Sequence, residues 1–196
     1  MNNKQIQEQR MRTYFLQATR EILRSEGLKN ISVRNVADRA GYSYATLYNY
    51  FKDVKDLVFE CVLDFQQECR EFISDEVKNM KPGRERLVQI NRAYFKYFVQ
   101  YPGIFELFYI EKTTDLAHRQ PTIEKIDTFL PSLMEEDWEV MIQEKVIEPE
   151  GAALLQEQIR FFIVGVLISY INRRYVADYP EVMAMVDQHL NYMLNM

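Results

Sequence analysis

Hydroxyl, amide and cationic side chains are concentrated between residues 32 and 52 of this 196-residue chain. Such side chains can hydrogen-bond to the phosphate oxygens and to the base edges of nucleic acids. The sequence offers no Ser/His/Asp or Cys/His set, no cluster with metal-ligand spacing and no Gly-rich phosphate loop. We therefore expect this stretch to recognise a partner and not to catalyse a reaction, and we expect the protein to need no cofactor or metal.

Two short helices are expected to present these side chains. Ser32 can cap the first helix, whose valines and alanines recur at three- and four-residue spacing on one face, and Gly41 can end it with a positive φ. Ser43 can cap the second helix. Three apolar side chains are expected to close a small core around this second helix: Ala45, Leu47 and Phe51.

The tyrosines of the same stretch leave a second interpretation open. Those at even spacing are Tyr42, Tyr44, Tyr48 and Tyr50. This spacing would also suit one face of an edge strand. The preceding glycine, the serine cap and the lack of a partner strand elsewhere in the sequence favour the helix.

The segment GYSYATLYNYFKDVKDL, residues 41–57, resembles the signature of the TetR (tetracycline repressor) family of bacterial transcriptional regulators. The resemblance extends upstream through FLQATREILRSEGLKNISVRNVADRAG, residues 15–41, and covers about residues 10–60. It implies a three-helix, helix-turn-helix DNA-binding head at residues 1–52. It also implies a larger helical body at residues 53–196 that binds an effector and dimerises.

In such a head the second helix of the helix-turn-helix, here the one that Ser43 caps, enters the major groove. Its N-terminal residues then lie nearest the bases. The residues expected to read bases are Tyr44, Ala45, Thr46 and Asn49. Those expected to hold phosphates are Ser32, Arg34, Ser43, Tyr48, Tyr50 and Lys52. No Lys or Arg lies between Tyr42 and Tyr50, which departs from many relatives and removes the commonest contact to guanine. Thymine methyl groups are therefore the expected targets.

The net charge of −5 is divided unevenly along the chain. Residues 1–52 contain 9 Lys and Arg against 4 Asp and Glu, whereas residues 53–196 contain 15 against 25. A basic head on an acidic body would concentrate phosphate attraction at the helix-turn-helix. The same split would also be ordinary for a solvated surface.

With only 6 Gly, 6 Pro and few alternating runs, the chain is predicted to be all-α with about nine helices. Besides the two short helices, apolar periodicity between Gly and Pro breaks places helices at residues 4–26, 53–79, 84–101, 104–112, 121–145, 149–175 and 180–194. Residues 113–120 are predicted to form a loop. Pro102 and Gly103 are predicted to form a break, and Pro131 either a kink or an internal helix start.

The helix predicted at residues 149–175 is apolar nearly all round between Phe161 and Ile168. Such a helix must be covered on every side, and Gly165 would let another helix approach closely. We expect a second copy of the chain to cover it, through the last two helices of each copy as the family resemblance implies. The alternative is that this helix is the central helix of the monomer.

Aromatic residues crowd residues 94–109, and further rings in the later helices could join them. Together they could wall a pocket for a small hydrophobic or aromatic effector. The residues expected to line it are Tyr94, Phe98, Phe105, Phe108, Tyr109, Phe129, Trp138 and Phe162. An aromatic stripe at helical spacing is more often core than ligand site, so both interpretations stay open here.

The sequence thus predicts a homodimeric, sequence-specific DNA-binding transcriptional regulator, a repressor that a small-molecule effector releases from a palindromic operator. The alternative is a DNA-binding dimer without a small ligand, controlled by a protein partner or by its own concentration. The most apolar run, residues 161–171, has 11 residues against the ~20 of a transmembrane helix, and the N-terminus lacks the apolar core of a signal peptide. A cytoplasmic protein without membrane contact is therefore expected.

Overall fold

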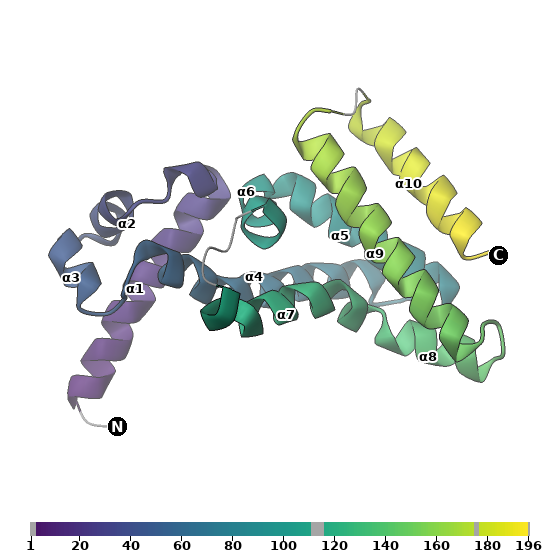
Figure 1. Ribbon diagram of the computed structural model, residues 1–196, viewed down its shortest axis with the longest axis horizontal. Coiled ribbons are helices and arrows are strands. Elements are labelled where there is room, and N and C mark those ends of the chain that lie inside the picture. The colour runs from purple at the N-terminus through teal and green to yellow at the C-terminus, as the bar shows by residue number, and fades with distance from the viewer. Residues whose placement is uncertain (1–2, 111–115, 175–176, 196) are drawn as a thin grey trace. The chain divides into compact units, whose positions relative to one another are not determined.

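The computed structural model describes residues 3–110, 116–174 and 177–195, with only the backbone for residues 116–120, and these ranges contain helices and no strand (Figure 1). The helices are ten α-helices, one 3₁₀-helix and one π-helix. The prediction of an all-α fold is confirmed. The strand interpretation of the tyrosines is wrong, because Tyr44–Tyr48 form α3.

The chain forms two compact units. The first unit comprises Met1–Gln67 and Tyr101–Thr122, and the second comprises Glu68–Gln100 and Ile123–Met196. The long helix α4, Val54–Val77, contributes residues to both units. The division into functional domains after residue 52 stays a prediction.

The helix-turn-helix in the first unit packs around one apolar core. Its elements are α1 (Asn3–Ser25), the 3₁₀ turn η1 (Leu28–Asn30), α2 (Val33–Ala40), α3 (Tyr44–Tyr48) and the beginning of α4. The buried core residues are Phe15, Ala18, Ile22, Val36, Leu47, Phe51 and Leu57.

The prediction that Ala45 joins this core is wrong, because its side chain is exposed. Helix α3 has only five residues, and Leu47 is the one that is buried. Ala45 precedes Leu47 by two positions and so points about 200° away from it around the helix. The geometry of a short helix thus frees Ala45 for other contacts.

The first unit also contains α6 (Pro102–Phe105) and the π-helix η2 (Glu106–Ile110). A Cβ atom added at Gly103 would lie 2.4 Å from the carbonyl oxygen of Leu23, so α6 approaches the end of α1 as closely as only glycine permits. The break predicted at Pro102 and Gly103 falls instead at Tyr101. Pro102 occupies the first turn of α6, where its missing N–H costs nothing.

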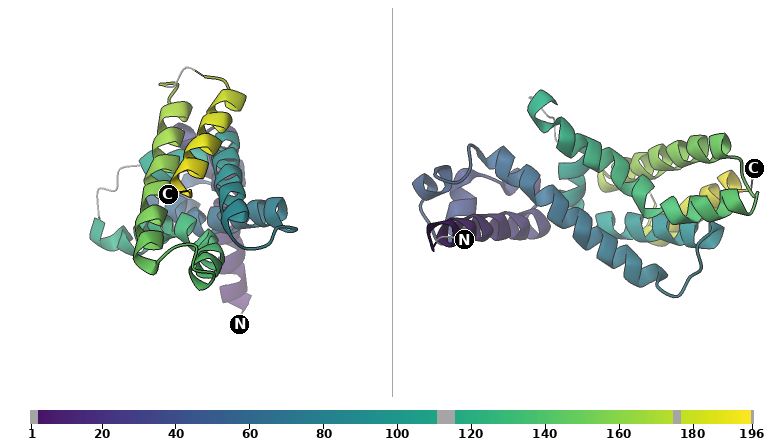
Figure 2. Two further views of the ribbon diagram at one scale, coloured as in Figure 1. Left: turned by 90° about the vertical axis from the view of Figure 1, so that its right-hand side faces the viewer. Right: turned by 90° about the horizontal axis from the view of Figure 1, so that it is seen from below.

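The second unit is built from α5, most of α7, α8, α9 and α10. Their bounds are Arg84–Gln100, Leu116–Leu133, Glu135–Gln143, Pro149–Ile171 and Tyr179–Met193. Figures 1 and 2 show α9 and α10 side by side and running in opposite directions. This pair of helices corresponds to the last two helices of the sequence prediction.

The single helix predicted at residues 121–145 is wrong, because the structure has two helices, α7 and α8, separated at Met134. Pro131 lies in the last turn of α7, and the break follows where the Met134 N–H donates to the Pro131 carbonyl at 3.1 Å. Three acidic residues in the first turn of α8 favour a helix start there, because they complement the helix dipole. This division gives ten α-helices in the described residues, close to the predicted number of about nine.

Helix α7 begins at Leu116, inside the loop predicted at residues 113–120. That prediction is wrong for residues 116–120, which are helical. Residues 113–115 lie outside the described residues. The apolar periodicity that marks most helices is weak in this stretch, which is why the sequence placed the helix start later.

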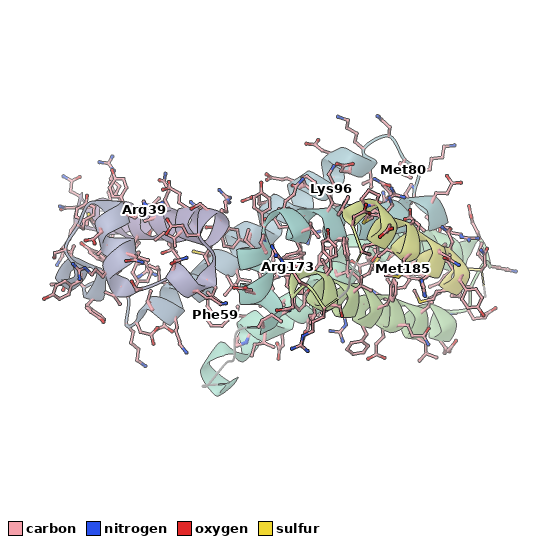
Figure 3. The ribbon with its side chains drawn as sticks, turned by 90° about the horizontal axis from the view of Figure 1, so that it is seen from above. Arg39, Phe59, Met80, Lys96, Arg173 and Met185 are labelled. Carbon is pink, nitrogen blue, oxygen red and sulfur yellow. The ribbon has the colours of Figure 1, made fainter. Side chains whose placement is uncertain are left out.

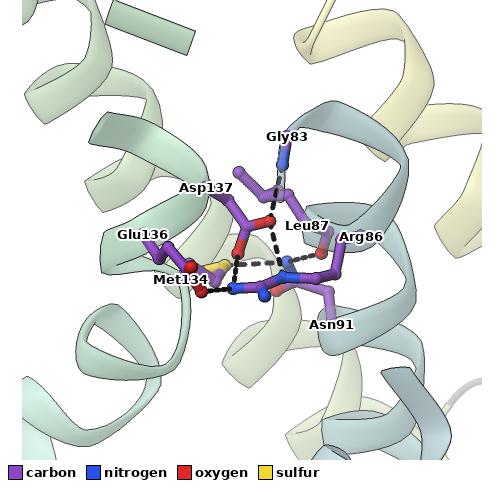
Figure 4. A network of polar contacts seen from close by, with 7 residues as sticks. All are labelled: Gly83, Arg86, Leu87, Asn91, Met134, Glu136 and Asp137. Carbon is purple, nitrogen blue, oxygen red and sulfur yellow. Dashed lines mark hydrogen bonds and ion pairs between the residues drawn. The ribbon is translucent and has the colours of Figure 1, made fainter. Parts of the chain in front are cut away.

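A buried carboxylate joins α5 to α8 (Figure 4). Asp137 is fully buried, and one of its oxygens accepts hydrogen bonds from the Gly83 N–H at 2.8 Å and from Arg86 Nε at 2.9 Å. Glu136 accepts a further bond from the same guanidinium at 2.7 Å. Because Gly83 directly precedes α5, the Asp137 charge also lies at the positive end of that helix dipole. This network fixes how the two helices meet.

Helix α9 is apolar but poorly covered within one chain. Only 22% of its most apolar 18-residue window is buried, and Leu154 and Phe161 are 63% and 59% exposed. By length and composition alone α9 could cross a membrane. This corrects the expectation that no segment is long enough, which counted one apolar run and not the whole helix.

Candidate nucleic-acid interface

The caps predicted for the helix-turn-helix are present. Ser32 Oγ accepts a hydrogen bond from the Asn35 N–H at 3.1 Å and so caps α2, and Gly41 ends α2 in the left-handed region with a φ of 78°. Ser43 Oγ accepts from the Thr46 N–H at 3.2 Å and caps α3. These local interactions define the start and end of both helices.

The side chains predicted to contact DNA all remain accessible. Tyr44 and Tyr48 are 65% and 54% exposed, and Arg34 and Lys52 are exposed as well. The other six are exposed or half-buried: Ser32, Ser43, Ala45, Thr46, Asn49 and Tyr50. The structure thus brings the base-reading and phosphate-holding candidates onto the surface of one small helical motif.

Tyr50 differs from the other candidates, because its ring is half-buried against the core. Its centroid lies 6.2 Å from that of Phe15. The tip of Tyr50 is the part that could reach a phosphate, while its ring helps to fix the turn between α3 and α4.

Arg12 is a positioning residue that the sequence reasoning missed. Its guanidinium donates to the Tyr50 carbonyl at 2.5 Å and to the two carboxylate oxygens of Glu60 at 2.6 and 2.7 Å. The same group lies 4.3 Å from the centroid of the Phe51 ring. Arg12 therefore joins α1 to α4 and to the segment that follows α3.

Two more arginines also join helices of this unit. Arg20 on α1 pairs with Asp64 on α4 at 2.6 Å. Arg39 on α2, labelled in Figure 3, pairs with Glu26 and lies 3.8 Å from Glu21. Pairs between elements far apart in sequence leave no local signal, so the sequence alone could not reveal them.

The residues predicted to line an effector pocket fall into two groups. Tyr94, Phe98 and Phe129 form one aromatic cluster in the second unit, with the Tyr94 centroid 4.8 Å from that of Phe98 and 6.1 Å from that of Phe129. Trp138 is buried in the same unit, and Phe162 stacks on His189 at 5.3 Å. The other group belongs to the first unit: Phe105, Phe108 and Tyr109.

Other side chains in the described residues offer little chemistry. Burial raises the pKa of Cys61 to about 12 and also raises the pKa of Cys69, so neither thiol is ionised at neutral pH. Within the same residues no group of three His, Cys, Asp or Glu side chains could hold a metal ion. Recognition through exposed polar groups is the chemistry that the first unit presents.

A capped helix-turn-helix with a polar, exposed second helix, carried on an otherwise helical protein, defines the class of helix-turn-helix DNA-binding proteins. Residues 15–61 match the family model of the bacterial regulatory proteins of the tetR family. Residues 15–61 are accordingly a DNA-binding domain of the tetR family type. The resemblance found in the sequence is thereby confirmed.

Solved structures of this family share the fold over nearly the whole chain. A TetR-family regulator from Syntrophomonas wolfei is similar with a TM-score of 0.73 at 18% identity, covering 96% of each chain. The regulator FadR from Bacillus subtilis, solved in complex with stearoyl-CoA, has a TM-score of 0.73 at 18% identity, covering 93% of this chain and 97% of its own. The fatty acid degradation regulator FadR from Bacillus halodurans has a TM-score of 0.72 at 15% identity, covering 94% of each chain. No curated protein matches the sequence.

The contacts of Arg12 generate a prediction about the stability of the first unit. Arg12→Ala should lower its free energy of unfolding by about 2 kcal/mol, because the Tyr50 carbonyl and the Phe51 ring lose a charged partner. DNA affinity should fall several-fold while its salt dependence stays unchanged, because no phosphate contact is lost. Thermal unfolding and fluorescence anisotropy measure the two effects.

The matched control for Arg12 is Arg20→Ala, which removes the same charge and another pair to α4. It should cost less than about 1 kcal/mol, as expected for a partly exposed pair, and leave DNA affinity within about twofold. A flatter salt dependence for Arg12→Ala without loss of stability would instead mean that Arg12 touches a phosphate.

Proposed function

We propose that this protein is a homodimeric repressor that binds a palindromic operator and leaves it when a small effector binds the second unit. The family match and the exposed face of α3 support this proposal most directly. Two recognition helices about one DNA turn apart, ~34–36 Å, would read the two half-sites. An effector that moves α4 would change this spacing and so release the DNA.

In this proposal the beginning of α3 reads bases, through Tyr44, Ala45 and Thr46, with Asn49 reaching further along the groove. Ala45 has only a methyl group, and its exposure supports an apolar contact to a thymine methyl. Thr46 already shares a hydrogen bond with Ser43, since their hydroxyl oxygens are 2.9 Å apart. In this proposal its methyl group contacts the base edges.

Phosphates are assigned to the last residue of α3 and to residues before and after this helix: Ser32, Arg34, Ser43, Tyr48, Tyr50 and Lys52. Arg34 is 88% exposed, and its nearest carboxylate, on Asp38, is 3.9 Å away. Such a loose surface pair can exchange its carboxylate for a phosphate at little cost. These contacts would set register and affinity but carry no sequence information.

DNA binding across a salt series tests the assignment. Wild-type protein should bind one fragment from upstream of its own coding region, or an operator selected from random DNA, at least about a thousandfold more tightly than random duplex. The Tyr48→Ala, Lys52→Ala variant should lose affinity with a shallower salt slope, because phosphate contacts disappear. Lys81→Ala, which removes an exposed cation from the second unit, should bind like wild type. Equally weak binding to every duplex would rule out a sequence-specific regulator.

The dimer is proposed to form through α9 and α10. The uncovered apolar residues of α9 support this, and so does Gly165, where an added Cβ would meet nothing within 4 Å. On α10 the neighbouring surface carries Tyr192, which is 69% exposed. A second copy would bury this apolar surface, so α9 would need no membrane to cover it.

We propose that the protein is cytoplasmic and that it is not an enzyme.

Phe161→Glu should break this dimer, because each copy would then bury a carboxylate at the interface, and its cationic neighbour Arg160 is already paired with Asp127. Light scattering after size exclusion should report a monomer, and operator affinity should fall by roughly a hundredfold because the two heads no longer bind together. Val146→Glu adds the same charge at another exposed apolar position, outside α9 and α10, and should stay dimeric. A dimeric Phe161→Glu protein would place the interface elsewhere.

The effector site is proposed within the second unit, around Tyr94, Phe98 and Phe129. Two buried polar atoms support a ligand there, because Asn91 Oδ1 and Trp138 Nε1 have no hydrogen-bond partner in the described part of the chain. Leaving such an atom unpaired costs ~1–3 kcal/mol, which a ligand with both a donor and an acceptor would recover. The stearoyl-CoA bound by FadR makes acyl-CoA thioesters the first effectors to test.

A thermal-shift panel of acyl-CoAs, fatty acids and aromatic compounds separates this proposal from its alternative. An effector at 100 times its Kd should stabilise the protein by ~2.7 kcal/mol and release it from the operator. Trp138→Phe should weaken that effector about tenfold, because it removes a donor and keeps most of the ring. Operator binding with no stabilising compound in the panel would favour a dimer controlled by a protein partner or by its concentration.

A further inference from the structure

The turns of α1 before Met11 lie outside the core of the first unit, whereas Met11 packs against this core. The earliest buried residue of this helix is Phe15, and residues 3–14 are exposed or half-buried. Figure 1 shows this part of α1 projecting past α2 and α3 toward the N-terminus. This part of α1 continues the helix that Phe15 anchors in the core, and most of its side chains are open to a partner.

One face of this projecting segment forms a continuous stripe. Its residues recur at three- and four-residue spacing and line an open hollow of about 480 Å³: Ile6, Gln9, Arg10, Thr13 and Tyr14. Arg10 is exposed, and no acidic partner is found for it in the described residues, whereas Arg12 and Arg20 of the same helix are paired with α4. The stripe therefore presents a cation whose charge is not already neutralised by the protein.

The stripe is continuous with the surface that α3 presents to DNA. The Tyr14 ring stacks on the Tyr42 ring, with centroids 6.1 Å apart and planes inclined by 30°. Tyr42 lies in the turn between α2 and α3, directly before the Ser43 cap. Tyr14 and Tyr42 are 48% and 37% exposed, so the two rings bridge the recognition helix and the α1 segment without being buried.

We propose that residues 3–14 of α1 form an arm that binds the sugar–phosphate backbone flanking each operator half-site. In this arm the Arg10 guanidinium holds a phosphate and the Tyr14 hydroxyl donates to a neighbouring one. An α-helix rises 1.5 Å per residue, so Arg10 lies ~6 Å beyond Tyr14 along the helix, and the whole arm is ~17 Å long, which is at most about 5 base pairs at 3.4 Å each. This proposal rests on the proposed operator binding and extends it to DNA outside the bases that α3 reads.

Charge and continuity favour DNA over other occupants of this face. Its one unpaired cation suits a polyanion, and its aromatic end is shared with the helix-turn-helix itself. A second copy of the chain would need an apolar surface, but Ile6 is the only aliphatic residue among the five that line the hollow.

The experiment compares two duplexes that carry the same selected operator. In the short duplex the DNA ends about 1 base pair outside the half-sites, and in the long one it extends ~6 base pairs further on each side, beyond the reach of the arm. Wild-type dimer should bind the long duplex roughly three- to tenfold more tightly, with a salt slope steeper by about 2, one phosphate for each arm. The Arg10→Gln, Tyr14→Phe variant should bind both duplexes within about twofold, with equal slopes.

Lys29→Gln is the matched control. Lys29 is also an exposed cation without an ion-pair partner in the described residues, but it lies in η1 after the other end of α1. This variant should keep the full preference for the long duplex. Circular dichroism of all variants should match wild type, because none of the substituted side chains is buried.

Each outcome decides between the proposals. Specific operator binding by wild type with no preference for the long duplex overturns the arm and leaves the proposed function intact. A preference that survives in the Arg10→Gln, Tyr14→Phe variant also overturns it, because the flanking contact then comes from elsewhere. Failure of wild type to bind any operator specifically overturns the proposed function and the arm together.

Discussion

Helix α3 is too short to be stable by itself, and the rest of the first unit is arranged to hold it. A helix of five residues makes barely one turn of hydrogen bonds, far below the ~12–15 residues at which isolated helices become stable. Its order therefore comes from outside. Leu47 is fully buried in the core, Ser43 caps the first turn, and Arg12 binds the carbonyl of the segment that follows.

This dependence links packing to recognition. Base edges are distinguished by hydrogen bonds and methyl contacts that tolerate displacements of well under 1 Å, so the position of α3 must be fixed as firmly as its side chains. Phe15 of α1 contacts the rings of Tyr42, Tyr50 and Phe51, which surround α3 on both sides along the chain. We therefore expect a core residue such as Phe15, which is fully buried, to influence the proposed DNA binding through the position of α3.

Local features could be predicted from the sequence, and features made by distant residues could not. Ser32, Ser43 and Gly41 act on neighbouring backbone groups, so their spacing was enough to predict both helices. Arg12 contacts a carbonyl 38 residues away, and Asp137 binds an arginine 51 residues away, and no local pattern indicates such a partner. The start of α8 is an intermediate case. Its acidic first turn is a local sign of a helix start, but the nearby Pro131 drew the predicted kink or helix start to an earlier position. In the candidate effector site, the sequence named Tyr94, Phe98 and Phe129 together with five other residues, and the fold shows which of these rings contact one another.

The basic character of the DNA-binding region is weaker than its composition indicates. Arg12 and Arg20 are neutralised by Glu60 and Asp64, two acids that a count ending at residue 52 assigns to the body. Arg39 is likewise paired with Glu26. These ion pairs hold helices together and cannot also attract phosphates at full strength. In the proposed DNA complex, we expect phosphates to be held by the few remaining cations, by hydroxyl groups and by the amides at the start of α2. Contacts from hydroxyl and amide groups depend less on salt than ion pairs do. For the proposed operator binding we therefore expect shape and methyl contacts to contribute more specificity than charge.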